Sequence, residues 1–309
     1  MLIPLLIIAR AVHIGTSMLL AGTCTFEVIT LGPARRAGSD DFRELQRRLL
    51  RLVRWSLVAA LLSALFWFWL EVANMSGLPM RAFSVAAWET VLFETNFGRV
   101  WQLRLGLIAL AFALVAISPA RVQARQALIM AVFLISILLL VSLAWVSHAA
   151  AASVQPLGLL GDALHLCAAS VWIGGLLPLA IFLTRARASL SLGEQTLPVL
   201  QRFSTLSLTC VGVLIASGIS NSWLLVGSIH ALLTTRYGWL LVAKLATFGI
   251  LVCLGARNQF VIKTRLTGVS DTADLLAQLR RNVVGETCLA LAVLTIVACL
   301  GVTPPARGL

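Results

Sequence analysis

The sequence is poor in charged residues and rich in apolar ones. Only 12% of its 309 residues are charged, while 60% are hydrophobic; a soluble domain carries about 25% charged residues. This deficit excludes an ordinary soluble domain and indicates an integral membrane protein. The six cysteines are scattered among apolar segments with no Cys-x-x-Cys pair, which gives no support to a disulfide framework or a structural zinc site. The sequence also lacks nucleophile motifs, phosphate loops and dinucleotide fingerprints, so no enzyme is predicted.

Long apolar runs define the expected fold. A bilayer core of about 30 Å needs roughly 20 apolar residues in a helix. Eight segments qualify, at about 3–30, 52–72, 99–117, 127–147, 159–183, 204–226, 239–260 and 282–300. The connections are short, so we predict one compact all-α membrane unit with no appended soluble domain. The first run has no basic flank and no cleavage site, and we expect it to be retained rather than removed as a signal peptide.

Basic residues are concentrated on one side of the predicted membrane. Loops 32–54, 118–126, 184–203 and 257–281 hold seventeen of the 24 lysines and arginines. The opposite side has four, namely Arg81, Arg99, Arg236 and Arg307, and three lie within spans, namely Arg10, Arg104 and Lys244. The basic loops are therefore predicted to be cytoplasmic, with both termini periplasmic. This topology accounts for the net charge of +12, and no nucleic-acid partner is predicted.

Three short motifs occur twice in the same order. Ala11-Val12-His13-Ile14 with Gly22 matches Ala163-Leu164-His165-Leu166 with Gly174, at an offset of 152. Arg54-Trp55-Ser56 matches Arg202-Phe203-Ser204 at 148, and Thr95-Asn96-Phe97-Gly98 with Arg104 matches Thr235-Arg236-Tyr237-Gly238 with Lys244 at 140. We therefore predict a single membrane domain, 1–309, built from two parallel four-helix repeats at about 1–150 and 151–309. An axis along the membrane normal would relate them.

The four histidines all fall in the outer half of the membrane or outside it. His13 lies in the first span, His148 ends the fourth, His165 begins the fifth, and His230 lies in the outer loop 227–238. An ionisable group in hydrocarbon is expensive, which makes an intramembrane histidine a functional-site hypothesis. His13 and His165 are equivalent in the repeat, so we expect them to face each other across the pseudo-twofold axis. Imidazole suits copper, zinc, iron and nickel, and thioether sulfur favours Cu(I).

Other buried or sulfur-bearing residues are candidates for the same path. Met75 and Met80 lie in the outer loop after the second span, and Cys24 shares a helix face with His13. We expect the side chains of Arg104 and Lys244 either to extend to the outer surface or to pair with Glu71 or Asp162. For Glu286, near the cytoplasmic start of the last span, we expect neutralisation by Arg54, Arg202 or Arg257. Structural ion pairing is the expected role of these charges, with a relay for protons or cations as the alternative.

Together these pieces resemble the bacterial copper resistance protein D family (CopD, PcoD). The matching pieces are Ser147-His148-Ala149, Asp162-Ala163-Leu164-His165, Val171-Trp172-Ile173-Gly174-Gly175-Leu176, Arg202-Phe203-Ser204, Thr235-Arg236-Tyr237-Gly238, Leu241-Val242-Ala243-Lys244-Leu245, Gly255-Ala256-Arg257-Asn258, Glu286 and Thr303-Pro304-Pro305. The resemblance is strongest over 145–305. It implies an eight-helix inner-membrane protein that handles copper, with transport from the periplasm toward the cytoplasm. Two positions depart from the family pattern, Ser147 for a glycine and Trp239 where arginine is frequent.

The sequence leaves several functions open. The preferred hypothesis is a copper permease. In it His13, His148 and His165 bind the ion, which a periplasmic copper-binding protein delivers, while His230, Met75 and Met80 are outer contacts and Cys24 is an inner ligand. The alternative is a b-type haem protein with His13 and His165 as axial ligands and with Arg104 and Lys244 holding the propionates. A non-transporting assembly or sensor protein is a third class. In a purely structural alternative, each intramembrane histidine hydrogen-bonds a serine or a carbonyl.

Overall fold

The computed structural model describes residues 2–32, 39–77, 80, 83–117, 122–147, 155–262 and 273–308. Within these ranges every regular element is a helix. The long helices are α1 (Leu2–Thr25, continued by the π-helix η1, Phe26–Thr30), α2 (Asp40–Met75), α4 (Asn96–Ile117), α5 (Val122–Ala144), α6 (Gln155–Ala186), α8 (Thr196–Leu225), α10 (Arg236–Arg257) and α12 (Ala273–Leu300). The short ones are α3 (Val85–Glu89), η4 (Thr90–Glu94), α7 (Leu190–Gly193), α9 (Ile229–Thr234), η6 (Asn258–Ile262) and η7 (Ala306–Gly308).

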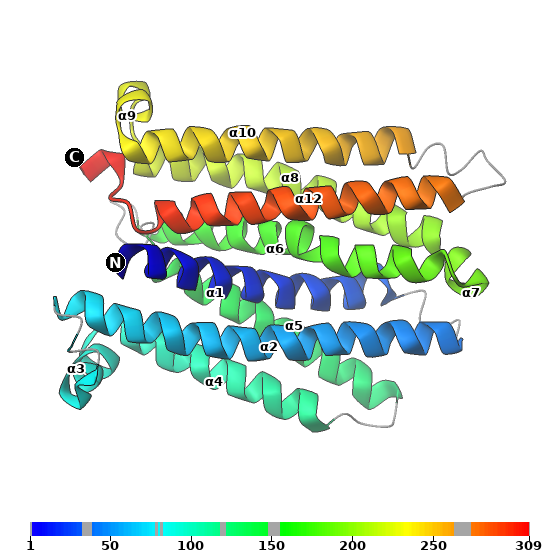
Figure 1. Ribbon diagram of the computed structural model, residues 1–309, viewed down its shortest axis with the longest axis horizontal. Coiled ribbons are helices and arrows are strands. Elements are labelled where there is room, and N and C mark those ends of the chain that lie inside the picture. Colours follow the sequence, from blue (N-terminus) through cyan, green and yellow to red (C-terminus); the bar gives the residue numbers. More distant parts are fainter. Residues whose placement is uncertain are drawn as a thin grey trace.

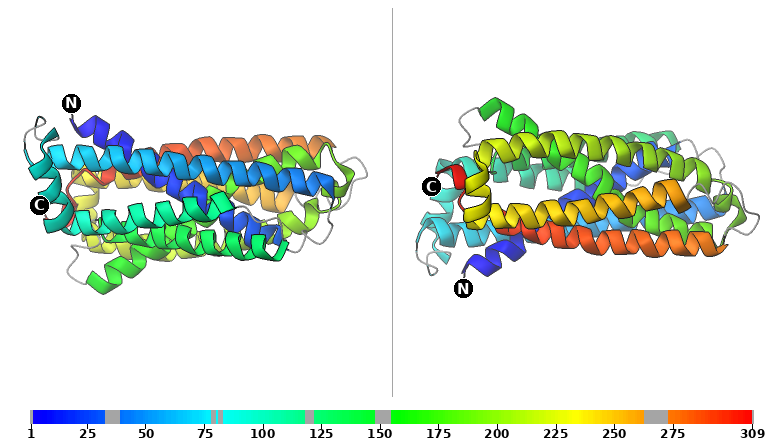
Figure 2. Two further views of the ribbon diagram at one scale, coloured as in Figure 1. Left: turned by 90° about the horizontal axis from the view of Figure 1, so that it is seen from below. Right: turned by 90° about the horizontal axis from the view of Figure 1, so that it is seen from above.

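Eight helices of the described chain are long and apolar enough to cross a membrane. They run side by side along one axis, as Figure 1 shows, and the views from below and above in Figure 2 agree. Both termini lie at the end of the bundle that carries α3 and α9, whereas α1, α4, α6 and α10 all finish toward the opposite end. The predicted all-α class and its eight spans are confirmed.

The second, sixth and eighth spans begin well before their predicted starts, because helix extends beyond the apolar run. The second begins at Asp40 rather than near residue 52, after Ser39 caps the helix by accepting a hydrogen bond from the Phe42 amide at 3.3 Å. Acidic residues in the first turn favour this start, because they face the positive end of the helix dipole. Glu44 then pairs with Arg47 and Arg48, at 3.2 and 3.1 Å. Hydropathy marks the membrane-buried part of such a helix and misses its charged extension.

Two apolar cores lie on either side of the contact between α1 and α6. Helices α1, α2, α4 and α5 bury one cluster, which includes Leu20, Trp67 and Trp101. Helices α6, α8 and α12 contribute most of the second, which includes Phe182 and Val199. Each half of the chain therefore packs most of its core by itself, although η1 and the start of α2 add Phe26, Phe42 and Leu45 to the second cluster.

The two halves meet where α1 crosses α6 at a pair of glycines. A Cβ atom added to Gly22 would collide with the Gly174 backbone, and one added to Gly174 would collide with the Met18 carbonyl and lie 3.3 Å from the Gly22 Cα. Small residues allow membrane helices to approach this closely. The contact places the two histidine-bearing helices side by side, nine residues from each histidine.

Candidate metal-binding histidine sites

His13 lies near the middle of α1 and has no exposed surface. Its Nδ1 is 2.9 Å from the Ser63 hydroxyl on α2, and its Nε2 is 2.6 Å from Nη2 of Arg104 on α4. These three residues form the N-terminal histidine site. Three helices of the N-terminal half thus converge on one ring, and both ring nitrogens have a partner.

The hydrogen-bond network fixes the tautomer of His13. The Ser63 hydroxyl donates its single proton to the Ala60 carbonyl, at 3.1 Å, so it accepts from His13 Nδ1–H. Arginine can only donate, which requires a lone pair on His13 Nε2. The assignment rests on this network, since proton positions follow from hydrogen bonding. His13 is therefore a neutral imidazole whose free lone pair points at a guanidinium.

Arg104 donates hydrogen bonds to several acceptors inside the bundle. Besides His13 it donates to the Leu139 carbonyl, to the Ser142 hydroxyl at 2.6 Å and to the Ser17 hydroxyl at 3.4 Å. The side chain has no exposed surface. The prediction that Arg104 extends to the surface or pairs with a carboxylate is wrong, because neutral acceptors inside the bundle bind both of its terminal nitrogens, while its buried Nε has no partner among the described residues.

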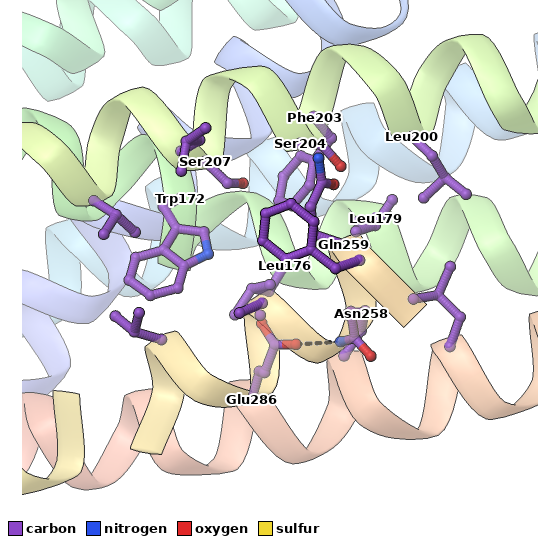
Figure 3. A pocket seen from close by; sticks show the side chains of 18 residues that line it. Trp172, Leu176, Leu179, Leu200, Phe203, Ser204, Ser207, Asn258, Gln259 and Glu286 are labelled. Atoms are coloured by element: carbon purple, nitrogen blue, oxygen red, sulfur yellow. Dashed lines mark hydrogen bonds between the residues drawn. The ribbon is translucent and has the colours of Figure 1, made fainter. Parts of the chain in front are cut away.

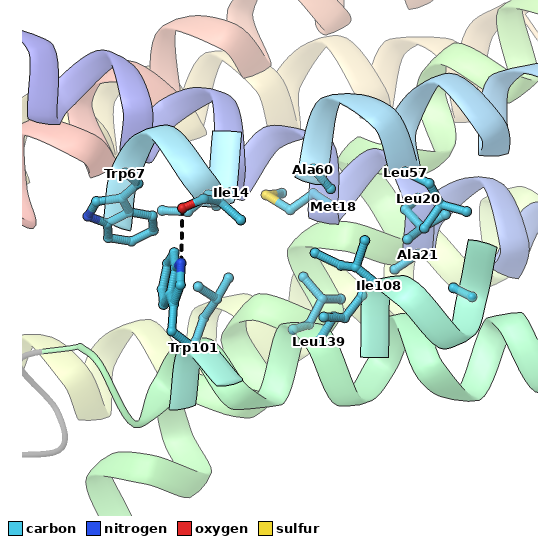
Figure 4. Close-up of a cluster of buried hydrophobic side chains, with 14 of the residues drawn as sticks. Ile14, Met18, Leu20, Ala21, Leu57, Ala60, Trp67, Trp101, Ile108 and Leu139 are labelled. Carbon is cyan, nitrogen blue, oxygen red and sulfur yellow. Dashed lines mark hydrogen bonds between the residues drawn. The ribbon is translucent and has the colours of Figure 1, made fainter. Parts of the chain in front are cut away.

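Two tryptophans enclose the His13 ring. The ring centroids of Trp67 and Trp101 lie 5.6 and 5.4 Å from it. Trp101 Nε1 donates to the Ala64 carbonyl at 2.9 Å, the dashed bond in Figure 4, and Trp67 Nε1 donates to Glu71 at 3.0 Å. Both indoles are therefore fixed in orientation. The N-terminal histidine site is a closed polar centre inside an apolar cluster.

His165 on α6 has the same arrangement with partners from the C-terminal half. Its Nδ1 is 3.0 Å from the Ser217 hydroxyl on α8, and its Nε2 is 3.4 Å from the Lys244 ammonium on α10. Ser217 donates to the Val213 carbonyl at 2.6 Å, so it too accepts from Nδ1–H. These residues form the C-terminal histidine site, in which the lone pair of Nε2 again faces a cation.

The C-terminal histidine site is more open and includes an acid. His165 and Lys244 are both half-buried. Asp162, one turn before His165, lies within Coulombic range of Lys244 and accepts hydrogen bonds from Ser147 and, at 3.5 Å, from the Asn221 amide. Lys244 is thus near its predicted partner Asp162, but among the described residues no ion pair within 4.0 Å joins them, and Lys244 contacts the histidine instead.

The prediction that His13 and His165 face each other is wrong. Each ring turns away from the α1–α6 contact and forms its hydrogen bonds within its own half. In the described ranges no three His, Cys, Asp or Glu side chains are grouped as a metal site would require. A single haem held by both rings does not fit this geometry. In both sites the ring Nδ1 bonds a serine hydroxyl, as the purely structural alternative predicts.

The remaining candidates lie apart from the two sites. Met75 lines an outer pocket of about 400 Å³ together with Arg10 and Glu71. Met80 is 80% exposed, and His230 is exposed on α9 rather than in an irregular loop. Cys24 is buried in the apolar cluster of the N-terminal half. His148 lies outside the described residues.

Glu286 on α12 has amide rather than arginine neighbours. Its Oε1 accepts from Asn258 Nδ2 at 2.5 Å. Among the described residues no lysine or arginine nitrogen lies within 4.0 Å of its carboxyl. The expected neutralisation by Arg54, Arg202 or Arg257 is therefore wrong, because the polar asparagine occupies the position that a counter-ion would take.

Sequence reasoning missed the two serines that orient the rings. Ser63 and Ser217 are related by an offset of 154, whereas the Arg-x-Ser motifs on the same helices are related by 148. Aligning the helices on that motif therefore places Val211 opposite Ser63. A search for a serine about fifty residues after each histidine would have found both, at separations of 50 and 52.

Comparisons with known proteins converge on copper proteins. The family model described as Copper resistance protein D-like, N-terminal domain, matches residues 1–159, and that described as Copper resistance protein D matches 197–300. No solved structure matches.

Three curated relatives span different shares of this chain. It is 28% identical to Copper resistance protein D of Pseudomonas syringae pv. tomato, over 98% of this chain and 97% of that protein. It is 32% identical to Copper transport protein CutJ of Bacillus subtilis (strain 168), over 74% of this chain but only 43% of that longer protein. With Inner membrane protein YebZ of Escherichia coli (strain K12) the identity is 29%, over 75% and 77%.

Proposed function

We propose, from the premise that this chain belongs to the copper resistance protein D family, that it is a copper permease. It is a multi-pass protein of the bacterial inner membrane, and in our proposal it moves copper from the periplasm toward the cytoplasm. A periplasmic copper-binding protein would deliver the ion. Copper is its cargo rather than a resident cofactor.

The proposed topology has both termini in the periplasm. It is supported by seventeen basic residues on one side against four on the other, together with the location of both termini at the same end of the bundle. We further propose that the halves are parallel four-helix repeats. Paired contacts support this: Thr95 caps α4 through the Gly98 amide at 2.9 Å, and Thr235 caps α10 through the Gly238 amide at 3.0 Å.

The observation that carries the proposal is the orientation of the two imidazoles. Metal-binding histidines commonly donate their second ring N–H to an oxygen acceptor, which fixes the tautomer and aims the other nitrogen. Ser63 and Ser217 accept this bond from His13 and His165. Each Nε2 lone pair is thus free to bind copper once the adjacent side-chain cation moves away. Imidazole nitrogen is a ligand that copper accepts readily.

The C-terminal histidine site is the better candidate for exchangeable copper. Lys244 lies 3.4 Å from His165, whereas Arg104 lies 2.6 Å from His13. Asp162 is near enough to attract the displaced ammonium. We therefore assign capture to His165, with His148, the residue after Ser147, as a second ligand and with His230 and Met75 as outer contacts. The buried His13 and the core residue Cys24 belong to the other half.

Metal analysis of purified protein tests this assignment. We expect copper in the wild type and a loss of bound copper in His165→Ala, while Leu164→Ala, on the exposed face of the same helix, serves as the matched control. Copper uptake by cells separates a permease from a sensor, because only the permease loses uptake when His165 is replaced. Unchanged copper content in His165→Ala would refute the ligand assignment, and a Soret band in the purified protein would favour haem.

A further inference from the structure

The inner part of the C-terminal half contains a pocket that the histidine sites do not use. It has a volume of about 130 Å³ and lies between α6, α8, α12 and the junction of α10 with η6 (Figure 3). Its walls are mainly apolar, with Trp172 and Phe203 among them. Glu286 from α12 and the hydroxyls of Ser204 and Ser207 from α8 supply polar groups. A space of this size can hold several water molecules where polar partners are present.

Several residues of the sequence pieces that resemble the copper resistance protein D family line this pocket. Trp172, Phe203, Ser204, Asn258 and Glu286 come from four different helical segments, yet all line it. In the sequence, most of them are far from His165. The pocket is therefore distinct from the C-terminal histidine site, although the same helices form part of both.

The pocket continues the path below His165. Trp172 follows His165 by seven residues, about 10 Å along α6 and on the same face. The Trp172 ring also lies 3.7 Å from the position of a Cβ on Gly255 of α10, the helix that carries Lys244. The helices that hold the C-terminal histidine site thus also enclose Glu286, nearer the end where the basic loops lie.

Glu286 has the surroundings of a carboxyl that binds a proton. It is 2% exposed, and its hydrogen-bond partner Asn258 is neutral and in turn accepts from Asn282 at 2.7 Å. A buried carboxylate without a counter-ion is strongly disfavoured, and protonation relieves this. Carboxylate and amide oxygens suit hard cations rather than the soft ligation that Cu(I) prefers.

The charged groups around Glu286 do not neutralise it within the described residues. On the neighbouring elements these are Arg202 of α8, which donates to the Thr30 carbonyl at 3.2 Å, the exposed Arg257 of α10, and the buried Glu27 of η1. On α12 itself, Arg280 and Arg281 are exposed. None of these arginines comes within 4.0 Å of the Glu286 carboxyl.

We propose that Glu286 is a proton-binding site coupled to copper movement, an inference that rests on the permease function. A copper ion passing Trp172 would favour the ionised carboxylate, so the proton leaves to water on the side of the basic loops. Once the ion has gone, the carboxylate takes up a proton from the water on the opposite side of the membrane, so that one proton crosses in each cycle. Copper flux would then depend on the proton gradient as well as on the copper gradient.

Infrared spectroscopy of the copper-free protein gives the first test. We expect a pH-dependent C=O band of a protonated carboxyl in the wild type and in Glu194→Gln, an exposed acid at the same end. The band should be missing in Glu286→Gln. In Asn258→Leu, which keeps the carboxyl but removes its donor, the band should shift, and this variant decides the matter if Glu286→Gln does not fold. A band unaffected by either substitution at 258 or 286 would overturn the proposal.

Uptake into proteoliposomes gives the second test. An imposed pH gradient should change copper uptake severalfold in the wild type and in Glu194→Gln. In Glu286→Gln the gradient should have no effect, although the copper Kd stays within about threefold. Gradient dependence that survives in Glu286→Gln would overturn coupling through this residue. If the wild type takes up no copper, the permease function fails, and the infrared test still decides whether Glu286 binds a proton.

Discussion

The two histidine sites follow one plan but differ in how firmly a cation closes them. In both, a serine accepts from Nδ1–H and a basic side chain faces Nε2. The N-terminal site uses a guanidinium that has no exposed surface and also bonds a carbonyl and serine hydroxyls. The C-terminal site uses a half-buried ammonium at 3.4 Å, with an acid nearby.

This difference follows from the chemistry of the two cations. Arginine presents five donors in a rigid fork and stays charged, whereas lysine is a point charge on a flexible stem. A guanidinium can therefore hold several fixed acceptors at once, and an ammonium can leave one partner for another. In our proposal, therefore, the N-terminal site stabilises the bundle while the C-terminal site exchanges its cation for copper.

Replacing Arg104 should have the largest effect on stability. Arg104→Met leaves His13 Nε2 without its donor and removes the further hydrogen bonds from Arg104 to the Leu139 carbonyl and to the Ser142 and Ser17 hydroxyls. Hydrogen bonds to charged groups contribute about 1.5–3 kcal/mol each, so we expect a loss of about 3 kcal/mol or more in the free energy of unfolding. Lys244→Met, the matched change in the other half, should cost about 1 kcal/mol. Denaturation in detergent measures both, and equal losses would remove the distinction between the sites.

Replacing His165 should have the largest effect on copper. We expect His165→Ala to weaken copper binding about 100-fold, which corresponds to about 2.7 kcal/mol. His13→Ala should change the copper Kd by less than about threefold while lowering the melting temperature, because its ring is closed off by Arg104. Titration of both variants with copper measures this contrast. A larger loss of affinity in His13→Ala would reverse our assignment of the exchangeable site.

Exchanging the two basic residues tests whether the type of cation causes the difference between the two histidine sites. Lys244→Arg gives the C-terminal site the fork of the N-terminal one. Charge-assisted hydrogen bonds contribute about 1.5–3 kcal/mol each, so we expect copper affinity to fall about thirtyfold with little loss of stability. The reciprocal Arg104→Lys should destabilise the bundle without creating a second copper site. Copper binding that is unchanged in Lys244→Arg would show that the cation does not compete with the metal.

The spans and the paired residues could be predicted from sequence, but the direction of the rings could not. Hydropathy marks all eight helices, and the offsets pair His13 with His165 and Arg104 with Lys244. The rotation of a helix about its axis is left undefined when apolar residues surround it, as in α1, where the exposed side chains of Ile8 and Val12 are as apolar as the buried Ile14. Gly22 and Gly174 bring α1 against α6, and each ring bonds partners within its own half, away from this contact.

The smallest expected contrast concerns the serines that orient the rings. Residues behind a metal ligand typically change metal affinity 10–100-fold, and because the Ser217 bond is neutral we expect Ser217→Ala to weaken copper binding by about tenfold, at the lower limit. Ser63→Ala should leave copper affinity unchanged and lower the free energy of unfolding by about 1 kcal/mol, the net value of one hydrogen bond. Ser217→Thr keeps the hydroxyl and is the control in the copper titration. If both alanine variants bind copper as the wild type does, the serines act only in packing, and His165 owes its orientation to Lys244 alone.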